Sequence, residues 1–190
     1  MIKKADNSDI QNIIDLHLSS FNKNHFSAVF SKEMLKRYFE NLLELNDFNF
    51  VFYNDKQKEL LGYVIAGYNS QEAVNKFIKK NYFAVIRTLI KNPKFLSEKV
   101  SEVSQKIFGT KYKKKAKCRL YLIAVNQNYK GKGIGKQLTN FLENEIREKG
   151  LNLYGLSVRK DNKDAIGFYN QNGYKVEFEN SKSIYYIKEI

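Results

Sequence analysis

The sequence contains one cysteine, one proline, two histidines and no tryptophan among its 190 residues. The single cysteine, Cys118, cannot form an internal disulfide, and such sparse cysteine use is typical of the reducing cytoplasm. Two histidines without a Cys/His cluster exclude the usual zinc sites, so we expect no metal. There is also no run of 18 apolar residues, and residues 1–6 lack an apolar signal region. The sequence therefore predicts a cytoplasmic protein with no membrane partner.

Acidic residues are outnumbered, because 33 Lys and Arg residues stand against 20 Asp and Glu residues and leave a net charge of +13. A basic chain raises nucleic acid as a partner. The lysines are scattered, however, and arginine-rich or aromatic-basic motifs are lacking. The one dense basic run, at 111–119, precedes a strand-like segment and fits a solvated loop, with binding of phosphates, an acidic substrate or nucleic acid as alternatives. We therefore expect no nucleic-acid partner.

The apolar patterns predict an α/β protein. Hydrophobic residues make up 43% of the chain, enough for one core at this length. We expect one domain over residues 1–190, with the element order β-α-α-β-β, a helical insertion at 71–109, and then β-α-β-α-β-β. Pro93 fits a break between two helices of the insertion, and residues 7–9 fit the cap of the first helix. Strands are expected at 2–5, 48–53, 60–68, 118–125, 152–158, 174–178 and 183–187, and helices from 10, from 31, at 134–149 and at 162–171.

The stretch Lys130-Gly131-Lys132-Gly133-Ile134-Gly135, called the glycine turn below, is the most informative part of the sequence. It lies between an expected strand and an amphipathic helix that Gly150 is placed to end. Three glycines allow a sharp turn, and the following helix presents unpaired N–H groups, so the turn predicts a site for a phosphate or pyrophosphate. Gln137 excludes a P-loop, which requires Ser or Thr there, and Lys136 excludes the third glycine of a dinucleotide fingerprint.

The glycine turn resembles the pyrophosphate loop of the GNAT superfamily of N-acetyltransferases, which reads Gln/Arg-x-x-Gly-x-Gly/Ala. Lys130 takes the first position, and Gly133 and Gly135 take the other two. About 30 residues later, the run from Asn162 to Tyr169 resembles the family's Asn-x-x-Ala-x-x-Phe-Tyr segment. The resemblance implies a mixed central sheet flanked by helices, with the insertion before the core strand. The helical insertion also resembles, more weakly, insertions in bacterial members that N-acylate surface polysaccharides or nucleotide sugars.

This resemblance implies that acetyl-CoA is the acyl donor. Backbone amides of the glycine turn would hold its pyrophosphate, and the end of the strand at 123–125 would separate from its neighbour and pair with the pantetheine arm. The N–H of Val125 would face the thioester oxygen, a contact worth about 3–4 kcal/mol. Asn162 is expected to begin the last helix, either as its N-cap alone or, as the resemblance implies, also as a contact of the pantetheine arm. The implied cofactor-binding residues are Ile123, Ala124, Val125, Lys130, Gly131, Lys132, Gly133, Ile134, Gly135, Lys136, Asn162, Phe168 and Tyr169.

Tyr169 is the expected general acid, because a phenol with a pKa near 10 can donate a proton to a thiolate with a pKa of about 8–9. The alternative is a tyrosine of the core. The general base is open, and His25 is the first choice, although a histidine of the surface is the alternative for it. We expect His17 to be structural and Cys118 to be a packing residue. The other candidates for the base are Glu33, Tyr53, Glu59 and a chain of water molecules.

The sequence therefore predicts an N-acetyltransferase that transfers an acetyl group directly in a ternary complex, since it offers no well-placed nucleophile. The expected acceptor is the primary amine of a small molecule, with a nucleotide-linked amino sugar as one candidate. A protein or peptide N-acetyltransferase and a non-catalytic acetyl-CoA-binding module are the alternatives. Exposed edge strands and the insertion permit a homodimer.

Overall fold

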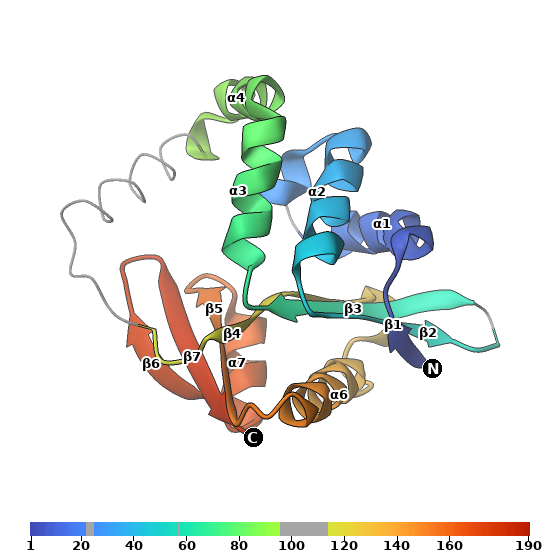
Figure 1. Ribbon diagram of the computed structural model, residues 1–190, viewed down its shortest axis with the longest axis vertical. Coiled ribbons are helices and arrows are strands. Elements are labelled where there is room, and N and C mark those ends of the chain that lie inside the picture. The colour runs from blue at the N-terminus through green and yellow to red at the C-terminus, as the bar shows by residue number, and fades with distance from the viewer. Residues whose placement is uncertain (22–24, 57, 96–113) are drawn as a thin grey trace.

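A computed structural model describes residues 1–21, 25–56, 58–95 and 114–190 (Figure 1). A seven-stranded mixed sheet in the order β1-β2-β3-β4-β5-β7-β6 forms its centre. Only β4 and β5 run parallel, and every other neighbouring pair is antiparallel. The predicted α/β fold is thereby confirmed. The strands are β1 (Ile2–Lys4), β2 (Phe48–Asn54), β3 (Glu59–Gly67), β4 (Cys118–Val125), β5 (Leu153–Arg159), β6 (Lys175–Glu179) and β7 (Ser183–Glu189).

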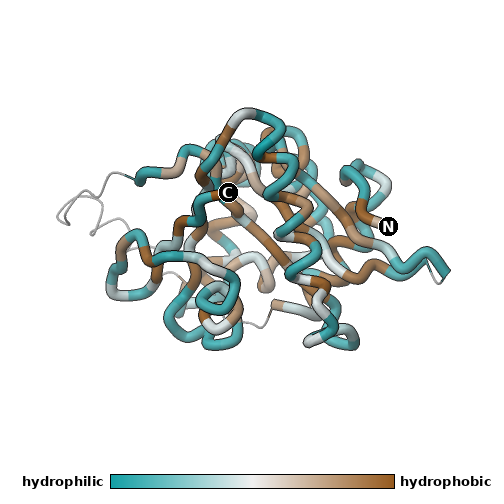
Figure 2. Tube along the Cα trace, turned by 90° about the horizontal axis from the view of Figure 1, so that it is seen from below, coloured by the Kyte–Doolittle hydropathy of each residue, from teal (hydrophilic) through white to brown (hydrophobic). Residues whose placement is uncertain are grey.

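Helices cover both faces of the sheet. In Figure 1, α1, α2 and α3 lie on one face and α6 lies on the other. Each face has its own buried cluster, one built around α1 and α2 and the other around α6, β5 and β7. Figure 2 shows hydrophobic residues along the interior strands and mostly hydrophilic residues at the periphery. The helices are α1 (Ile10–Ser20), α2 (Lys32–Leu45), α3 (Ser70–Lys80), α4 (Tyr82–Lys91), α6 (Ile134–Glu148) and α7 (Lys163–Gln171), with short 3₁₀ turns η1 (Asn7–Asp9), η2 (Phe26–Val29) and η3 (Gln127–Tyr129).

Capping residues fix the helix ends. Ser31 accepts a hydrogen bond from the amide of Met34 and begins α2, as its sequence position predicts. The cap before α1 lies one residue earlier than expected, because Asp6 and Asp9 form a reciprocal capping box around η1. Gly150 follows α6 with a φ of +74°, the left-handed conformation expected of a glycine that ends a helix.

The segment predicted as a helical insertion, 71–109, is helical over most of its described part. It holds α3 and α4, which are separated at Asn81, a break that the sequence did not predict. The Asn81 side chain donates to the carbonyl of Phe77, where α3 ends. α4 ends at Lys91 and the chain is helical again at 93–95, so Pro93 lies at a break between helices, as predicted. The expected second helical run, 95–108, lies almost wholly outside the described residues. In the described ranges, no helix has the length and hydropathy to cross a membrane.

The parallel pair β4–β5 is short, and this positions the candidate site. The two strands pair only from Cys118 to Leu120 and from Tyr154 to Leu156. Beyond this paired stretch, β4 continues to Val125 and β5 continues to Arg159. The strands therefore separate after three residues, as the sequence resemblance implied.

Candidate active site

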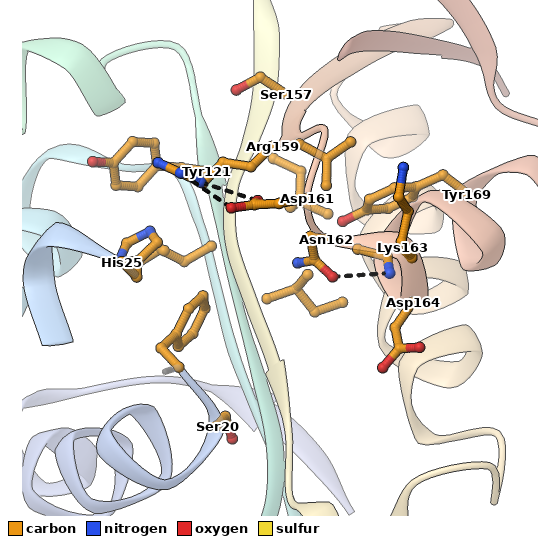
Figure 3. A pocket seen from close by; sticks show the side chains of 16 residues that line it. Ser20, His25, Tyr121, Ser157, Arg159, Asp161, Asn162, Lys163, Asp164 and Tyr169 are labelled. Carbon is orange, nitrogen blue, oxygen red and sulfur yellow. Dashed lines mark hydrogen bonds and ion pairs between the residues drawn. The ribbon is translucent and has the colours of Figure 1, made fainter. Parts of the chain in front are cut away.

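The diverging ends of β4 and β5 enclose a cavity of about 550 Å³, called the first cavity (Figure 3). β4 stays paired with β3 as far as Val125, so only its other edge is open. The amide of Asn126 donates to the carbonyl of Leu61, which makes Gly62 and Val125 a pair without mutual hydrogen bonds. The N–H and C=O of Val125, and by the same alternation those of Ile123, therefore point away from β3 and into the gap.

Ala124 has the opposite orientation. It pairs with Tyr63, in the register where backbone groups bond across the two strands. The hydroxyl of Ser20, at the end of α1, donates to the carbonyl of Val125 at 3.3 Å. The open backbone groups at this end of the gap are thus the N–H of Val125 and both groups of Ile123, whereas those of Ala124 face β3.

The glycine turn lies beside this open strand end. Gly131 and Gly133 have φ values of +78° and +79°, a conformation that side-chain-bearing residues rarely adopt. No side chain caps α6, so the first N–H groups of the helix are left for a ligand. A Cβ built on Gly135 would lie 3.4 Å from the Phe168 ring and 3.7 Å from the Val125 side chain. The turn, the strand end and α7 therefore meet at one place.

The lysines of the glycine turn contact neighbouring residues. Lys130 forms an ion pair of 2.5 Å with Asp164, in the first turn of α7, and both side chains are mostly exposed. Lys132 lies over the ring of Tyr129, 4.7 Å from its centroid. Lys136 lies in the first turn of α6, and Ile134 is buried against the sheet. The pair of Lys130 and Asp164 thus links the glycine turn to the helix that carries Tyr169.

Glu59 anchors the segment that leads into the turn. Its carboxylate accepts hydrogen bonds of 2.8 Å from the side-chain amide of Asn126 and from the Tyr129 hydroxyl. These contacts connect the start of β3 to both ends of η3. Glu59, a sequence candidate for the base, does not line the first cavity.

Tyr169 is almost fully buried, with 5% of its surface exposed, yet it lines the first cavity. Its ring packs against Tyr174 and Tyr186 at centroid distances of 4.9 and 5.7 Å. Figure 3 shows its hydroxyl directed into the cavity. Burial, with a smaller contribution from Tyr174, raises the pKa of Tyr169 well above its usual range. The phenol therefore keeps its proton at neutral pH.

Asn162 caps α7, as the sequence predicts. Its side-chain oxygen accepts a hydrogen bond of 3.1 Å from the amide of Ala165. In Figure 3 the side-chain nitrogen of Asn162 points to the interior of the first cavity. One side chain therefore ends the helix and also offers a hydrogen-bond donor to a ligand.

His25 is the one sequence candidate for the base that lines the first cavity, together with Tyr121 and Arg159. Burial, and secondarily the charge of Arg159, lowers the pKa of His25 to about 4, so its imidazole is neutral at pH 7. Glu33 is paired with Arg37 on the surface. The Tyr53 hydroxyl, at the end of β2, bonds Asp9 and Asn12.

A second cavity of about 240 Å³ adjoins the first and shares His25, Tyr121 and Arg159 with it. Tyr121 and Arg159 were missed by the sequence reasoning. Arg159 could have been found from its position, because it is a charged residue at the end of a core strand, and ligands of α/β sheets often bind at the carboxyl ends of strands. The rest of the lining is mostly apolar and comes from η2 and its cap, α2, α3, the segment after α4, and the β6–β7 loop with the start of β7. These residues are Phe26, Ser27, Phe30, Tyr38, Val74, Phe77, Ile78, Phe95, Lys182 and Ser183.

Cys118 is fully buried, and burial raises the pKa of its thiol to about 12. The predicted packing role is confirmed, because a thiol so protonated is a poor nucleophile. Within the described ranges, no three His, Cys, Asp or Glu side chains are grouped to hold a metal ion.

A family model described as the acetyltransferase (GNAT) family matches residues 10–174. No curated protein matches the chain in sequence. Solved structures match in fold. The PaiA N-acetyltransferase of Thermoplasma acidophilum in complex with coenzyme A has a TM-score of 0.63 and 18% identity, and the alignment covers 100% of this chain and 98% of that one.

Two further solved structures also match this chain in fold. The ribosomal-protein-S18-alanine N-acetyltransferase of Escherichia coli has a TM-score of 0.59 and 15% identity, with 100% and 93% coverage. Naa20 of Chaetomium thermophilum, in complex with a bisubstrate analogue, has a TM-score of 0.57 and 14% identity, with 100% and 86% coverage. At these identities the likeness concerns the fold.

Proposed function

This chain belongs to the GNAT family of acetyltransferases, and we propose that it transfers the acetyl group of acetyl-CoA directly to the primary amine of a small molecule. The observation that carries the proposal is the gap between β4 and β5, which exposes backbone groups of Ile123 and Val125 next to the glycine turn. Cys118 is sealed in the core, which supports direct transfer over a covalent acyl-enzyme.

The residues present fit acetyl-CoA. The uncapped start of α6 and the left-handed glycines leave amides that would hold the pyrophosphate. The open backbone groups of Ile123, together with the Asn162 side chain, would bond the amides of the pantetheine arm. When bound, acetyl-CoA supplies a thioester carbonyl carbon that a neutral amine can attack.

Two groups of this chain would act on the reacting atoms. The N–H of Val125 would donate to the carbonyl oxygen, where negative charge develops as the amine attacks, and such a donor is worth about 3–4 kcal/mol. The Tyr169 hydroxyl would donate its proton to the departing sulfur, and the proton that the amine nitrogen loses as the amide forms would pass through water and restore the phenol. The raised pKa of Tyr169 ensures that this proton is present at neutral pH.

The second cavity would hold the acceptor. Its phenylalanines favour a compact amine with an apolar body. Lys182 at its wall, beside an Arg159 that is ion-paired with Asp161, favours an amine that also carries an anionic group. This lining supports such an amine over a nucleotide-linked amino sugar. A peptide N-terminus is the second candidate, because two similar structures are protein N-acetyltransferases or bind a bisubstrate analogue.

The test is the release of free thiol from acetyl-CoA in the presence of amines of three classes. These classes are compact amino acids and arylalkylamines, peptides, and nucleotide-linked amino sugars. We expect fastest release with the first class. Release only with peptides or amino sugars contradicts the small apolar acceptor, and calorimetric binding of acetyl-CoA without release in any class contradicts catalysis by this protein.

A further inference from the structure

Four side chains form a continuous hydrogen-bond chain between the core and the active-site wall. The Tyr63 hydroxyl bonds Nδ1 of His17 at 2.7 Å, Nε2 of His17 bonds the Ser27 hydroxyl at 2.7 Å, and that hydroxyl bonds Nδ1 of His25 at 2.7 Å. Tyr63 and His17 are fully buried, and Ser27 is 3% exposed. The chain ends at His25, which lines both cavities.

The chain has a preferred direction. In the part of the molecule that the structure describes, Nδ1 of His17 is the only group that the Tyr63 hydroxyl contacts through a hydrogen bond. Because a buried hydroxyl proton without an acceptor is costly, Tyr63 donates to His17. Neutral His17 then carries its proton on Nε2 and donates to Ser27, whose own proton is left for Nδ1 of His25. In the opposite direction the Tyr63 proton has no acceptor.

We propose that Tyr63, His17 and Ser27 are positioning residues that hold His25 as the neutral tautomer with its proton on Nε2. His25 then offers a fixed hydrogen-bond donor, not a base, where the two cavities meet. Its Nδ1 lone pair is occupied by Ser27, and its Nε2 already carries a proton. His25 therefore has no free nitrogen with which to deprotonate an ammonium group in the cavity.

This donor selects the chemistry of the acceptor, an inference that rests on the proposed function of the second cavity. A neutral N–H attracts an oxygen with lone pairs and repels an ammonium group. Arg159 lies on the same wall, ion-paired with Asp161 at 3.1 Å (Figure 3), so a guanidinium and the His25 donor converge there. They fit an amine that bears a carboxylate or carbonyl oxygen close to its nitrogen.

The tautomer can be measured by nitrogen NMR of the imidazoles, without any substrate. The chain has two histidines, so His25→Gln assigns both sets of signals. We expect both rings as the Nε2–H form at neutral pH, with the Nδ1 signals shifted by hydrogen bonding. A proton on Nδ1 of His25, or a charged His25 ring, overturns the proposal whether or not the protein has acetyltransferase activity.

Two variants test the chain itself. Ser27→Ala removes the donor to His25, so the His25 Nδ1 signal should move to that of an unbonded nitrogen and the His17 Nε2 proton should exchange faster. Tyr63→Phe removes the donor to Nδ1 of His17, so the His17 Nδ1 signal should move to that of an unbonded nitrogen while both rings keep the proton on Nε2, because a reversed chain would leave a buried Nδ1–H without an acceptor. Ser19→Ala is the matched control, because the Ser19 hydroxyl bonds the Leu16 carbonyl outside the chain. Unchanged imidazole signals in Ser27→Ala or Tyr63→Phe overturn the proposal.

A kinetic comparison tests the recognition of oxygen. Phenylalanine and phenethylamine differ by one carboxylate, and we expect the first to be the better acceptor. Ser27→Ala should raise the KM for phenylalanine roughly 3–10-fold, the effect of one lost hydrogen bond, with little change for phenethylamine or for acetyl-CoA. Equal changes for the two amines contradict selection by His25, whereas no turnover of either amine contradicts the proposed acceptor class and with it this recognition.

Discussion

Tyr169 combines deep burial with a hydroxyl that reaches the first cavity. Replacing it by phenylalanine removes the hydroxyl and keeps the ring contacts. We expect Tyr169→Phe to lower kcat about 10²–10⁴-fold, as for loss of a general acid, with little change in the Kd of acetyl-CoA. Steady-state kinetics and calorimetry check this. Equal losses in turnover and affinity, or none, contradict the role of general acid.

The pKa of Tyr169 adds a pH dependence. Because burial raises this pKa above the usual value, the phenol keeps its proton at higher pH than an exposed tyrosine does. A general acid is active while protonated, so Tyr169 should cause no alkaline loss of kcat below about pH 10. A kcat profile over pH 7 to 10, in wild type and in Tyr169→Phe, measures this. A fall in that range that is absent from the variant contradicts the assignment.

The glycine turn shows how an element prepares a site. Gly133 has left-handed backbone geometry, so Gly133→Ala should cost about 1–2 kcal/mol of unfolding free energy and weaken acetyl-CoA binding. Gly150 has nearly the same φ, +74°, at the far end of α6. Gly150→Ala should therefore cost similar stability and leave acetyl-CoA affinity unchanged. Urea unfolding and calorimetry on both variants separate the two effects, and equal affinity losses contradict the turn's role in binding.

Local elements were predictable where a few neighbouring residues determine them. The Asn162 cap and the turn at Gly150 follow from side-chain type and position alone. Pro93 correctly marks the break after α4, but the earlier break was missed, because Asn81 ends α3 by bonding the Phe77 carbonyl and an asparagine is a weaker sequence signal than a proline.

The second cavity was not predictable, because its walls come from segments far apart in sequence. Phe77 lies on α3 and packs against Phe30 and Tyr38, while Tyr121 and Arg159 come from two different strands. No periodicity within one element marks such a convergence. The resemblance in the C-terminal half indicated where the donor would bind, but only the folded chain brings together the residues that face the acceptor.

The stability of the whole molecule should depend on its two histidines. Burial lowers the pKa of His17 to about 3 and that of His25 to about 4, below the value of about 6.5 in the unfolded chain. The unfolded state therefore binds more protons as pH falls below 6.5, and stability decreases. The slope approaches at most about 1.4 kcal/mol per pH unit for the fully buried His17. Urea unfolding at pH 7.5 and 5 measures it, and His17→Gln should show a shallower slope. Equal slopes in the variant and in wild type contradict this origin.

The three-residue contact between β4 and β5 is also the only seam that joins two half-sheets, β1–β4 and β5–β7, in the described hydrogen-bond ladder. An extended ligand that forms hydrogen bonds with the open edge of β4 adds backbone hydrogen bonds that the sheet itself lacks there. The amides of Ile123 and Val125 should then gain protection from hydrogen exchange while that of Ala124, already bonded to β3, should not. An alternating pattern of protection along one strand edge would mean that the cofactor stiffens the enzyme as an additional strand does.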